Sequence, residues 1–168
     1  MKPLLLLAIA SLAFPMTVFA AAENCTASKK SAVCTDEIIK ERVNWACALV
    51  EKSGKEAIDE ISLMRFDCCG EPDYVWINDM HPTMVMHPIK TQLNKADLTK
   101  SEDHNADAAK KKFLFVEFVK AATPAGAWVD YSWKKVGEDK GSDKRSWVKK
   151  CKVGATPDFW VVGSGTWK

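Results

Sequence analysis

The stretch that most constrains the fold is residues 74–88, YVWINDMHPTMVMHP. Its first half alternates aromatic or polar residues with aliphatic ones, in the order Tyr74, Val75, Trp76, Ile77 and Asn78. A period of two is typical of a β-strand with two different faces. The turn residues Asp79, His81 and Pro82 then interrupt the run, and a second short apolar run follows. The stretch therefore predicts a β-hairpin.

One face of this hairpin is suited to pack on a helix, and the other carries rings and an amide. Tyr74, Trp76 and Asn78 suit a small polar ligand, because they combine shape with directional hydrogen bonds. The alternative is a half-buried hairpin in which Tyr74 and Trp76 only pack. Spacing alone favours this alternative.

Residues 1–20 are typical of a cleaved signal peptide. Lys2 provides a positive charge, an apolar run occupies residues 4–19, and Ala20 ends a small-residue cleavage pattern. We expect cleavage after Ala20, or alternatively after Ala22, and a soluble mature protein in the periplasm. A retained membrane anchor is the other alternative, which the shortness of the run disfavours. No other run is long and apolar enough to cross a membrane.

The remaining chain is long enough for one globular domain. Of the 168 residues, 27% are charged and 47% are hydrophobic, which suits a single core of ordinary size. The formal net charge of +2 is too small to indicate a nucleic-acid partner or an anionic membrane surface. We expect an N-terminal arm at residues 21–34 and one domain at residues 35–168.

Six cysteines lie beyond the predicted signal peptide, at Cys25, Cys34, Cys47, Cys68, Cys69 and Cys151. An even number of cysteines in an exported chain favours disulfides, although the sequence does not choose among the connectivities. A zinc site is disfavoured because there is no CxxC pair and the three histidines lie elsewhere. A redox-active thiol pair is also disfavoured, because Cys68 and Cys69 are adjacent.

A long amphipathic helix is predicted over residues 36–64. Thr35 is suited to cap its start, and Asp36 and Glu37 place negative charge where the helix dipole favours it. Apolar or small residues recur at steps of three, four and seven through Ile39, Val43, Ala46, Val50, Ala57, Ile61 and Met64. Gly54 lies inside the pattern and is a candidate for a bend.

The length of this helix restricts the disulfides. A straight helix over residues 36–64 rises about 43 Å, whereas bridged Cα atoms lie about 4.4–6.8 Å apart. Unless Gly54 folds the helix back on itself, Cys34 before the helix cannot reach Cys68 or Cys69 after it. The predicted pairings are Cys34 with Cys25 or Cys34 unpaired, and Cys151 with Cys68 or Cys69.

The second half of the chain predicts a short helix and three strands. Residues 90–112 are polar and predict a solvated connection. Residues 113–119 have the amphipathic pattern of a short helix. The three strand-like runs are residues 127–133, 144–150 and 159–163. With the hairpin and the long helix, they predict an α+β fold with one antiparallel sheet of about five strands.

Three classes of function are compatible with these elements. In a ligand-binding module, the hairpin face, His87 on the next strand, and Tyr131 and Trp133 on a third strand converge on one face of the sheet. An enzyme is disfavoured, because no GxSxG elbow and no facing pair of carboxylates is evident. Within this class, a metal- or thiol-dependent enzyme is the alternative that remains. The third class is a structural or interaction module without a small ligand.

Five blocks of the sequence carry a resemblance to a known family. They are YVWINDMHPTMVMHPIKTQLNKADL, LFVEFVKAA, GAWVDYSWKKVGEDK, KRSWVKK and FWVVGSGTW. In this order they resemble the single Cache domain of bacterial sensors. The resemblance implies an extracytoplasmic ligand-binding module with a long N-terminal helix packed on a PAS-like antiparallel sheet. It also implies a small organic ligand and a membrane receptor or sensor kinase as the partner that reads the bound state.

The sequence departs from the family pattern at two points near the expected site. Residues 68–71, CCGE, carry two cysteines, and Trp147 stands where tyrosine is usual. Arg65 lies at the end of the predicted long helix, and its role has two possible interpretations. Its guanidinium either bonds the carbonyls of its own helix or projects to the pocket mouth, where it would pair with a carboxylate. The resemblance favours the second reading.

The expected ligand is a small organic anion, in particular a carboxylate of about two to four carbons. We expect His87 and Arg65 to be the cations that compensate its charge. No catalytic residue, metal ligand or cofactor is expected. The candidate ligand-binding residues are Arg65, Tyr74, Trp76, Asn78, His87, Tyr131, Trp133 and Trp147.

Overall fold

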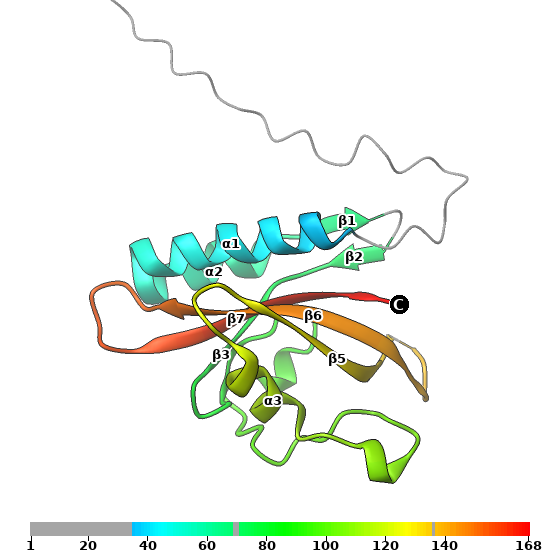
Figure 1. The fold of residues 1–168 in the computed structure, drawn as a ribbon. Helices are drawn as coiled ribbons and strands as arrows, with labels where there is room; N and C mark the ends of the chain where they lie inside the picture. Colours follow the sequence, from blue (N-terminus) through cyan, green and yellow to red (C-terminus); the bar gives the residue numbers. More distant parts are fainter. Residues whose placement is uncertain (1–34, 69–70, 136) are drawn as a thin grey trace, which may run out of the picture.

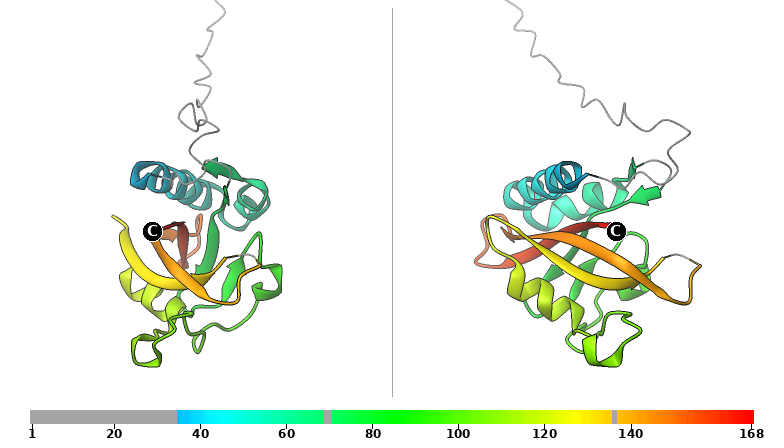
Figure 2. Two further views of the ribbon diagram at one scale, coloured as in Figure 1. Left: turned by 90° about the vertical axis from the view of Figure 1, so that its right-hand side faces the viewer. Right: turned by 45° about the vertical axis from the view of Figure 1, so that its right-hand side comes forward.

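The residues described by the computed structural model are 35–68, 71–135 and 137–168. This part of the chain has three layers. The helices α1 (Asp36–Ser53) and α2 (Ala57–Leu63) cover one face of a twisted sheet, and α3 (Leu114–Ala121) lies on the other side (Figures 1 and 2). None of the described helices has the length and apolar composition needed to span a membrane. The predicted signal peptide and arm, residues 1–20 and 21–34, lie outside the described residues and remain predictions.

A five-stranded antiparallel sheet forms the middle layer, in the order β4-β3-β7-β6-β5. Its strands are β3 (Trp76–Asp79), β4 (Met84–Met86), β5 (Ala127–Lys134), β6 (Gly141–Lys152) and β7 (Phe159–Trp167). The predicted α+β architecture, with a hairpin followed by three closing strands, is confirmed. The last strand along the chain lies in the middle of the sheet, so it joins the hairpin to the β5–β6 pair.

The remaining elements are short. The strands β1 (Phe66–Cys68) and β2 (Glu71–Asp73) form a separate two-stranded antiparallel ribbon, in a segment where the sequence predicted no strand. The 3₁₀ helices of the described residues are η1 (Gly54–Glu56), η2 (Thr91–Leu93) and η3 (Ala108–Lys110).

The first helix forms where its cap and its apolar stripe were predicted. The Thr35 hydroxyl oxygen accepts a hydrogen bond from the Ile38 backbone N–H at 3.4 Å, which pairs one of the free amides at the helix start. The buried side chains of α1 are Ile39, Val43, Ala46, Cys47 and Val50. They pack on β6 and β7, and each fully buried aliphatic side chain stabilises the fold by roughly 1.5–3 kcal/mol.

The predicted long helix is two helices, because the chain turns at Gly54. Gly54 has φ 59°, which favours glycine, and its backbone N–H donates to the Val50 carbonyl as a cap. The α2 helix then packs beside α1 (Figure 2). A continuous helix over residues 36–64 is therefore not formed, and the bend considered at Gly54 is a reversal.

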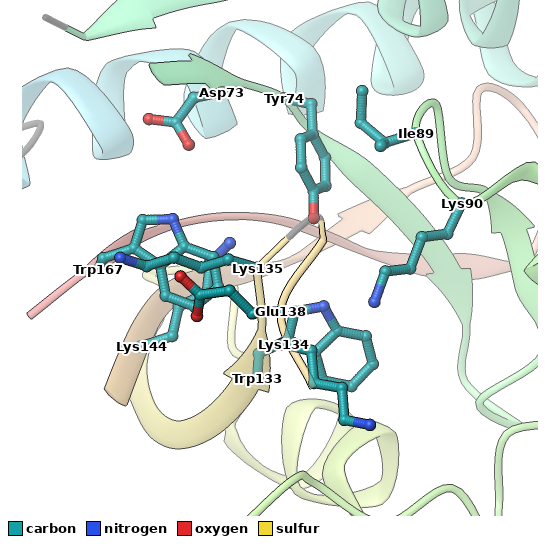
Figure 3. Close-up of a pocket in the computed structure, with 10 residues that line it drawn as sticks. All are labelled: Asp73, Tyr74, Ile89, Lys90, Trp133, Lys134, Lys135, Glu138, Lys144 and Trp167. Atoms are coloured by element: carbon teal, nitrogen blue, oxygen red, sulfur yellow. The ribbon is translucent and has the colours of Figure 1, made fainter. Parts of the chain in front are cut away.

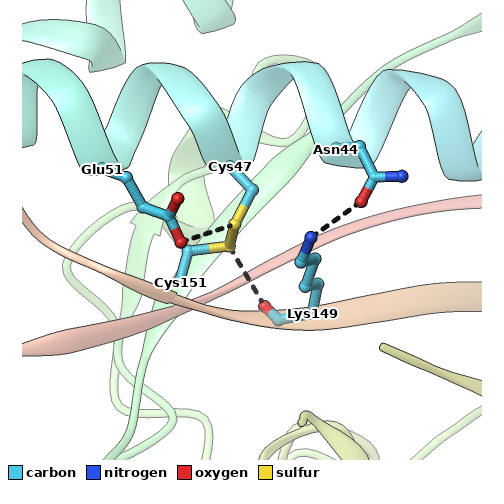
Figure 4. The surroundings of a disulfide bond; sticks show 5 residues. All are labelled: Asn44, Cys47, Glu51, Lys149 and Cys151. Carbon is cyan, nitrogen blue, oxygen red and sulfur yellow. Dashed lines mark hydrogen bonds between the residues drawn. A yellow bond between two sulfur atoms is a disulfide. The ribbon is translucent and has the colours of Figure 1, made fainter. Parts of the chain in front are cut away.

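A disulfide between Cys47 and Cys151 joins α1 to β6, with Cα atoms 5.5 Å apart (Figure 4). The prediction that Cys151 bridges to residue 68 or 69 is wrong. Cys47 lies on the buried stripe of α1 that packs on β6, so the middle of the helix faces Cys151. A hydrogen bond of 2.9 Å from Lys149 Nζ to Asn44 Oδ1 joins the same two elements nearby (Figure 4).

The reversal at Gly54 also affects the prediction for Cys34. A link from Cys34 to Cys68 or Cys69 was excluded only for a straight helix, and this geometric argument no longer applies. Cys25, Cys34 and Cys69 lie outside the described residues. The pairing of Cys34 therefore remains a prediction.

The layer on the other side of the sheet is anchored by α3 and by a buried carboxylate. Leu114, Phe115 and Phe118 are the buried residues of α3 and pack against the sheet. The Asp103 carboxylate accepts hydrogen bonds from the backbone N–H groups of Lys112, at 3.2 Å, and Ser132, at 3.1 Å. Because Ser132 belongs to β5, these bonds fix the segment before α3 to the sheet.

We predict that replacing both Cys47 and Cys151 by alanine lowers the free energy of unfolding by about 2–5 kcal/mol. The reason is that this disulfide closes a loop with a sequence separation of 104 residues, and such bridges restrict the unfolded chain. Urea denaturation of the parent and the double variant measures the difference. Equal urea midpoints would contradict the prediction, as would a non-reducing peptide map that separates the Cys47 and Cys151 peptides.

Candidate functional site

The side of the sheet that faces α3 contains a small cavity, which we call the aromatic cavity. It is lined by Tyr74, Trp76, His87, Leu114, Phe115, Phe118, Tyr131 and Trp133. Its volume of about 20 Å³ is room for roughly one water molecule. The structure thus brings together five of the eight residues that the sequence nominated for ligand binding.

The alternation along the first strand of the hairpin explains why these residues meet. Tyr74 and Trp76 pack in the hydrophobic cluster on the α3 side, whereas Val75 and Ile77 pack in the cluster on the α1 side. This is the two-faced strand that the period of two predicted. Tyr131 on β5 reaches the same face because β5 belongs to the same sheet, with β7 and β6 between it and β3.

The walls of the aromatic cavity are rings in contact with one another. The ring centroids of Trp76 and Phe118 are 5.2 Å apart, and those of Phe118 and Tyr131 are 5.3 Å apart at an edge-to-face angle. The Tyr74 and His87 rings are 4.8 Å apart. Such pairs add to the stability that burial provides, so the cavity has a defined shape.

Trp76 occupies its position because β7 has a glycine opposite it. Trp76 pairs with Gly163 in the sheet, and a Cβ at position 163 would overlap the Trp76 indole. The absence of a side chain at Gly163 leaves the space that the indole fills.

One wall of the cavity carries an unpaired donor. Trp76 is 4% exposed, and its Nε1–H is buried without a hydrogen-bond partner among the described residues. An unsatisfied buried N–H costs roughly 1–3 kcal/mol of free energy. A ligand with a hydrogen-bond acceptor would remove this cost.

His87 presents a second donor to this region, and it does so as a neutral ring. Its Nδ1 accepts hydrogen bonds from the backbone N–H groups of Lys90, at 2.9 Å, and Ile89, at 3.3 Å. The proton of the neutral ring must therefore lie on Nε2. Burial lowers the pKa of His87 to about 3, with the nearby cations Lys90, Lys144 and Arg65 adding to the shift. The expectation of a charged His87 is thus revised to a neutral donor.

The two tyrosines of the cavity keep their hydroxyl protons at neutral pH. Burial raises the pKa of Tyr131 well above its ordinary value, although the hydrogen bond with Ser146 opposes this. The Tyr131 and Ser146 hydroxyl oxygens are 2.7 Å apart. Burial, and then the charge of Asp73, raise the pKa of Tyr74 as well. Both phenols can donate or accept a hydrogen bond.

A second and larger cavity of about 410 Å³, which we call the lysine basin, adjoins the aromatic cavity (Figure 3). Tyr74 and Trp133 line both cavities. The residues that line the lysine basin are Asp73, Tyr74, Ile89, Lys90, Trp133, Lys134, Lys135, Glu138, Lys144 and Trp167. The cations of the site therefore lie in the basin, beside the aromatic cavity.

Lys144 is the buried cation at this border. It is 4% exposed, and its Nζ lies 4.3 Å from the ring centroid of Trp167 and 5.5 Å from that of Tyr74. Burial lowers the pKa of Lys144 to about 8, while the charge of Asp73 opposes the shift. Lys144 remains mostly protonated at neutral pH and supplies a positive charge next to Tyr74.

Three nominated residues do not line the aromatic cavity or the lysine basin. Arg65 is exposed, and its guanidinium donates to the carbonyls of Ser62, Met64 and Pro88. The first two carbonyls lie at the end of the helix that precedes Arg65. This arrangement corresponds to the first interpretation of Arg65, in which it bonds the carbonyls of its own helix. The Asn78 side chain is buried and donates to the Asp79 carbonyl at 2.9 Å.

Trp147 lies on the opposite face of the sheet from the aromatic cavity. It packs against the cluster beneath α1, and its ring centroid is 5.1 Å from Lys40 Nζ and 5.3 Å from the Trp128 centroid. Its neighbour Ser146 lies on the other face, as alternation along β6 requires, and its hydroxyl contacts that of Tyr131 there.

Sequence reasoning missed Lys144, Ser146 and the apolar wall from α3. A strand over residues 144–150 was predicted, and alternation places Lys144 and Ser146 on one face. Nothing in the sequence indicates which face of that strand adjoins a cavity. Among the described residues, no group of three or more His, Cys, Asp or Glu side chains is arranged to hold a metal ion.

Comparison with known proteins finds a matching domain family and a curated relative. The Cache domain family matches residues 34–168. The methyl-accepting chemotaxis protein McpP of Pseudomonas putida is 32% identical over 118 residues, which are 70% of this chain and 20% of that protein. The chain thus spans about a fifth of the length of this curated relative.

Solved structures of sensor domains share the fold. A periplasmic sensor domain of a chemotaxis protein has a TM-score of 0.59 and 33% identity, and the match covers 76% of this chain and 91% of that chain. A Cache chemosensory domain studied for carboxylic acid recognition has a TM-score of 0.58 and 26% identity, with 78% and 91% covered. Because the family match includes all the described residues, the chain belongs to the Cache domain family.

Proposed function

We propose that this protein is an exported sensor module that binds a short carboxylic acid in the aromatic cavity. The observation that carries the proposal is the buried Trp76 Nε1–H without a partner among the described residues, in a cavity that also holds His87. A carboxylate that leaves water must regain its hydrogen bonds. Two N–H donors on residues that line the cavity, beside a buried ammonium, meet this requirement.

The proposed pose places the carboxylate between the donors and the cation. His87 Nε2 and Trp76 Nε1 donate to its oxygens, and Lys144 compensates its charge from the border with the lysine basin. Lys144 lies close enough to His87 to contribute to the lowering of its pKa. The short alkyl part of the acid lies against Leu114 and Phe118, where its burial is favourable.

Binding requires the cavity to open. A volume of about 20 Å³ is close to the space of one water molecule, which is less than an acid of about two to four carbons occupies. Tyr74 and Trp133 line both this space and the lysine basin. Movement of these two rings is the shortest way to join the two cavities.

The relatives support a sensor rather than an enzyme. McpP is a methyl-accepting chemotaxis protein, and one similar Cache domain has been studied for carboxylic acid recognition. We propose by extension that the chain acts in the periplasm and that a membrane receptor or sensor kinase reads its bound state. Catalysis has no place in this proposal.

Calorimetric titration of acetate, propionate, lactate and pyruvate into ligand-stripped protein tests the proposal. Propionate should bind, and Trp76→Phe should weaken its binding by about 1.5–3 kcal/mol, the scale of one hydrogen bond to a charged group. Lys144→Gln should weaken it by about 1.5–3 kcal/mol, because a charged partner is lost. Trp76→Phe keeps an aromatic ring, so lost packing contributes little.

Trp147→Phe is the matched control, since Trp147 lies on the other face of the sheet. It should leave the dissociation constant of propionate unchanged. The proposal fails if none of the four acids binds. It also fails if Trp76→Phe and Trp147→Phe have the same effect.

The affinity for propionate should fall as the pH rises above about 8. The pKa of Lys144 is about 8, so its charge is present below this pH and is lost above it, by up to about tenfold in affinity per pH unit. His87, with a pKa of about 3, should produce no change between pH 6 and pH 8. Titrations at half-unit intervals from pH 6 to pH 9.5 measure the profile, and Lys144→Gln should flatten it. A loss of affinity centred near pH 6.5 would instead indicate a charged His87.

A further inference from the structure

The lysine basin holds more positive charge than one carboxylate can compensate. Four lysines and two carboxylates line it, which gives a formal charge of 4 − 2 = +2. Lys90, Lys134, Lys135 and Lys144 form no ion pair within 4.0 Å in the described part of the chain, where the ion pairs involve other cations. An excess of positive charge in one cavity favours an anionic occupant.

Aromatic rings hold three of these ammonium groups in place. Lys90 Nζ lies 4.3 Å from the Trp133 ring centroid, and Lys135 and Lys144 lie 5.2 and 4.3 Å from the Trp167 centroid. Rings attract cations without neutralising them, so these lysines remain able to pair with a ligand. Figure 3 shows the Lys90 side chain and the Tyr74 hydroxyl directed toward the space beside Trp133.

The nearest acidic group of the β5–β6 connection is engaged elsewhere. Glu138 Oε2 accepts a hydrogen bond from the Ser142 hydroxyl at 3.2 Å. Burial, and then the positive charge of Lys134, lower the pKa of Lys90. An anion beside Lys90 would relieve its repulsion with Lys134.

We infer that the lysine basin is a second carboxylate-binding subsite, so that the preferred ligand is a short dicarboxylate. This inference rests on the proposed function, because the first carboxylate occupies the aromatic cavity next to Lys144. The second carboxylate then lies in the basin and pairs with Lys90 and Lys135. Tyr74 and Trp133 border both cavities, so one short chain of carbon atoms connects the two subsites.

Calorimetric titration of succinate and butyrate tests the inference, because the two acids have equal numbers of carbon atoms and differ in one carboxylate. Succinate should bind the wild-type protein at least about tenfold more tightly, the effect of one further hydrogen bond to a charged group. Lys90→Gln and Lys135→Gln should each weaken succinate binding by about tenfold or more. Both variants should leave butyrate binding within about a factor of two.

Lys140→Gln is the matched control, since Lys140 is exposed in the same connection and does not line the basin. It should change neither affinity. If butyrate binds and succinate binds no more tightly, the second subsite is refuted while the proposed function stands. The same conclusion follows if Lys90→Gln and Lys135→Gln leave the preference for succinate intact. If neither acid binds, both the proposed function and this inference fail.

Discussion

The contact between Trp76 and Gly163 is the feature on which the rest of the site depends. A side chain at position 163 would overlap the indole, so the glycine of the central strand leaves room for the largest ring of the hairpin. The indole then walls the aromatic cavity and carries the N–H that lacks a partner among the described residues. Because β7 pairs with both β3 and β6, the same strand holds the two sides of the site together.

The two faces of the sheet have different roles, one in stability and the other in binding. Its α1 face is closed by aliphatic packing and by the disulfide between Cys47 and Cys151, whereas its α3 face holds the two cavities. On that face, charge and apolar surface are also separated. The donors of Trp76 and His87 lie in the apolar part, and the cations lie in the lysine basin. An acid that spans the border avoids placing a bare charge in an apolar space, which is costly.

The sequence predicted the side of the site that depends on local pattern. A period of two placed Tyr74 and Trp76 on one face, and the antiparallel order of the strands brought Tyr131 to the same face. The features that the sequence did not predict depend on tertiary packing. Lys144 was missed because alternation does not identify the face that meets a cavity. The pairing of Cys47 was missed because the packing of the middle of α1 on β6 is not encoded in cysteine spacing.

A structure from crystals grown with propionate most directly tests the central claim, which is that the acid binds in the aromatic cavity. The account predicts electron density for the acid in an opened aromatic cavity, with carboxylate oxygens within hydrogen-bond distance of Trp76 Nε1 and His87 Nε2. The alkyl group should contact Phe118. Propionate bound elsewhere, or an aromatic cavity that stays closed and empty at saturating propionate, would contradict it.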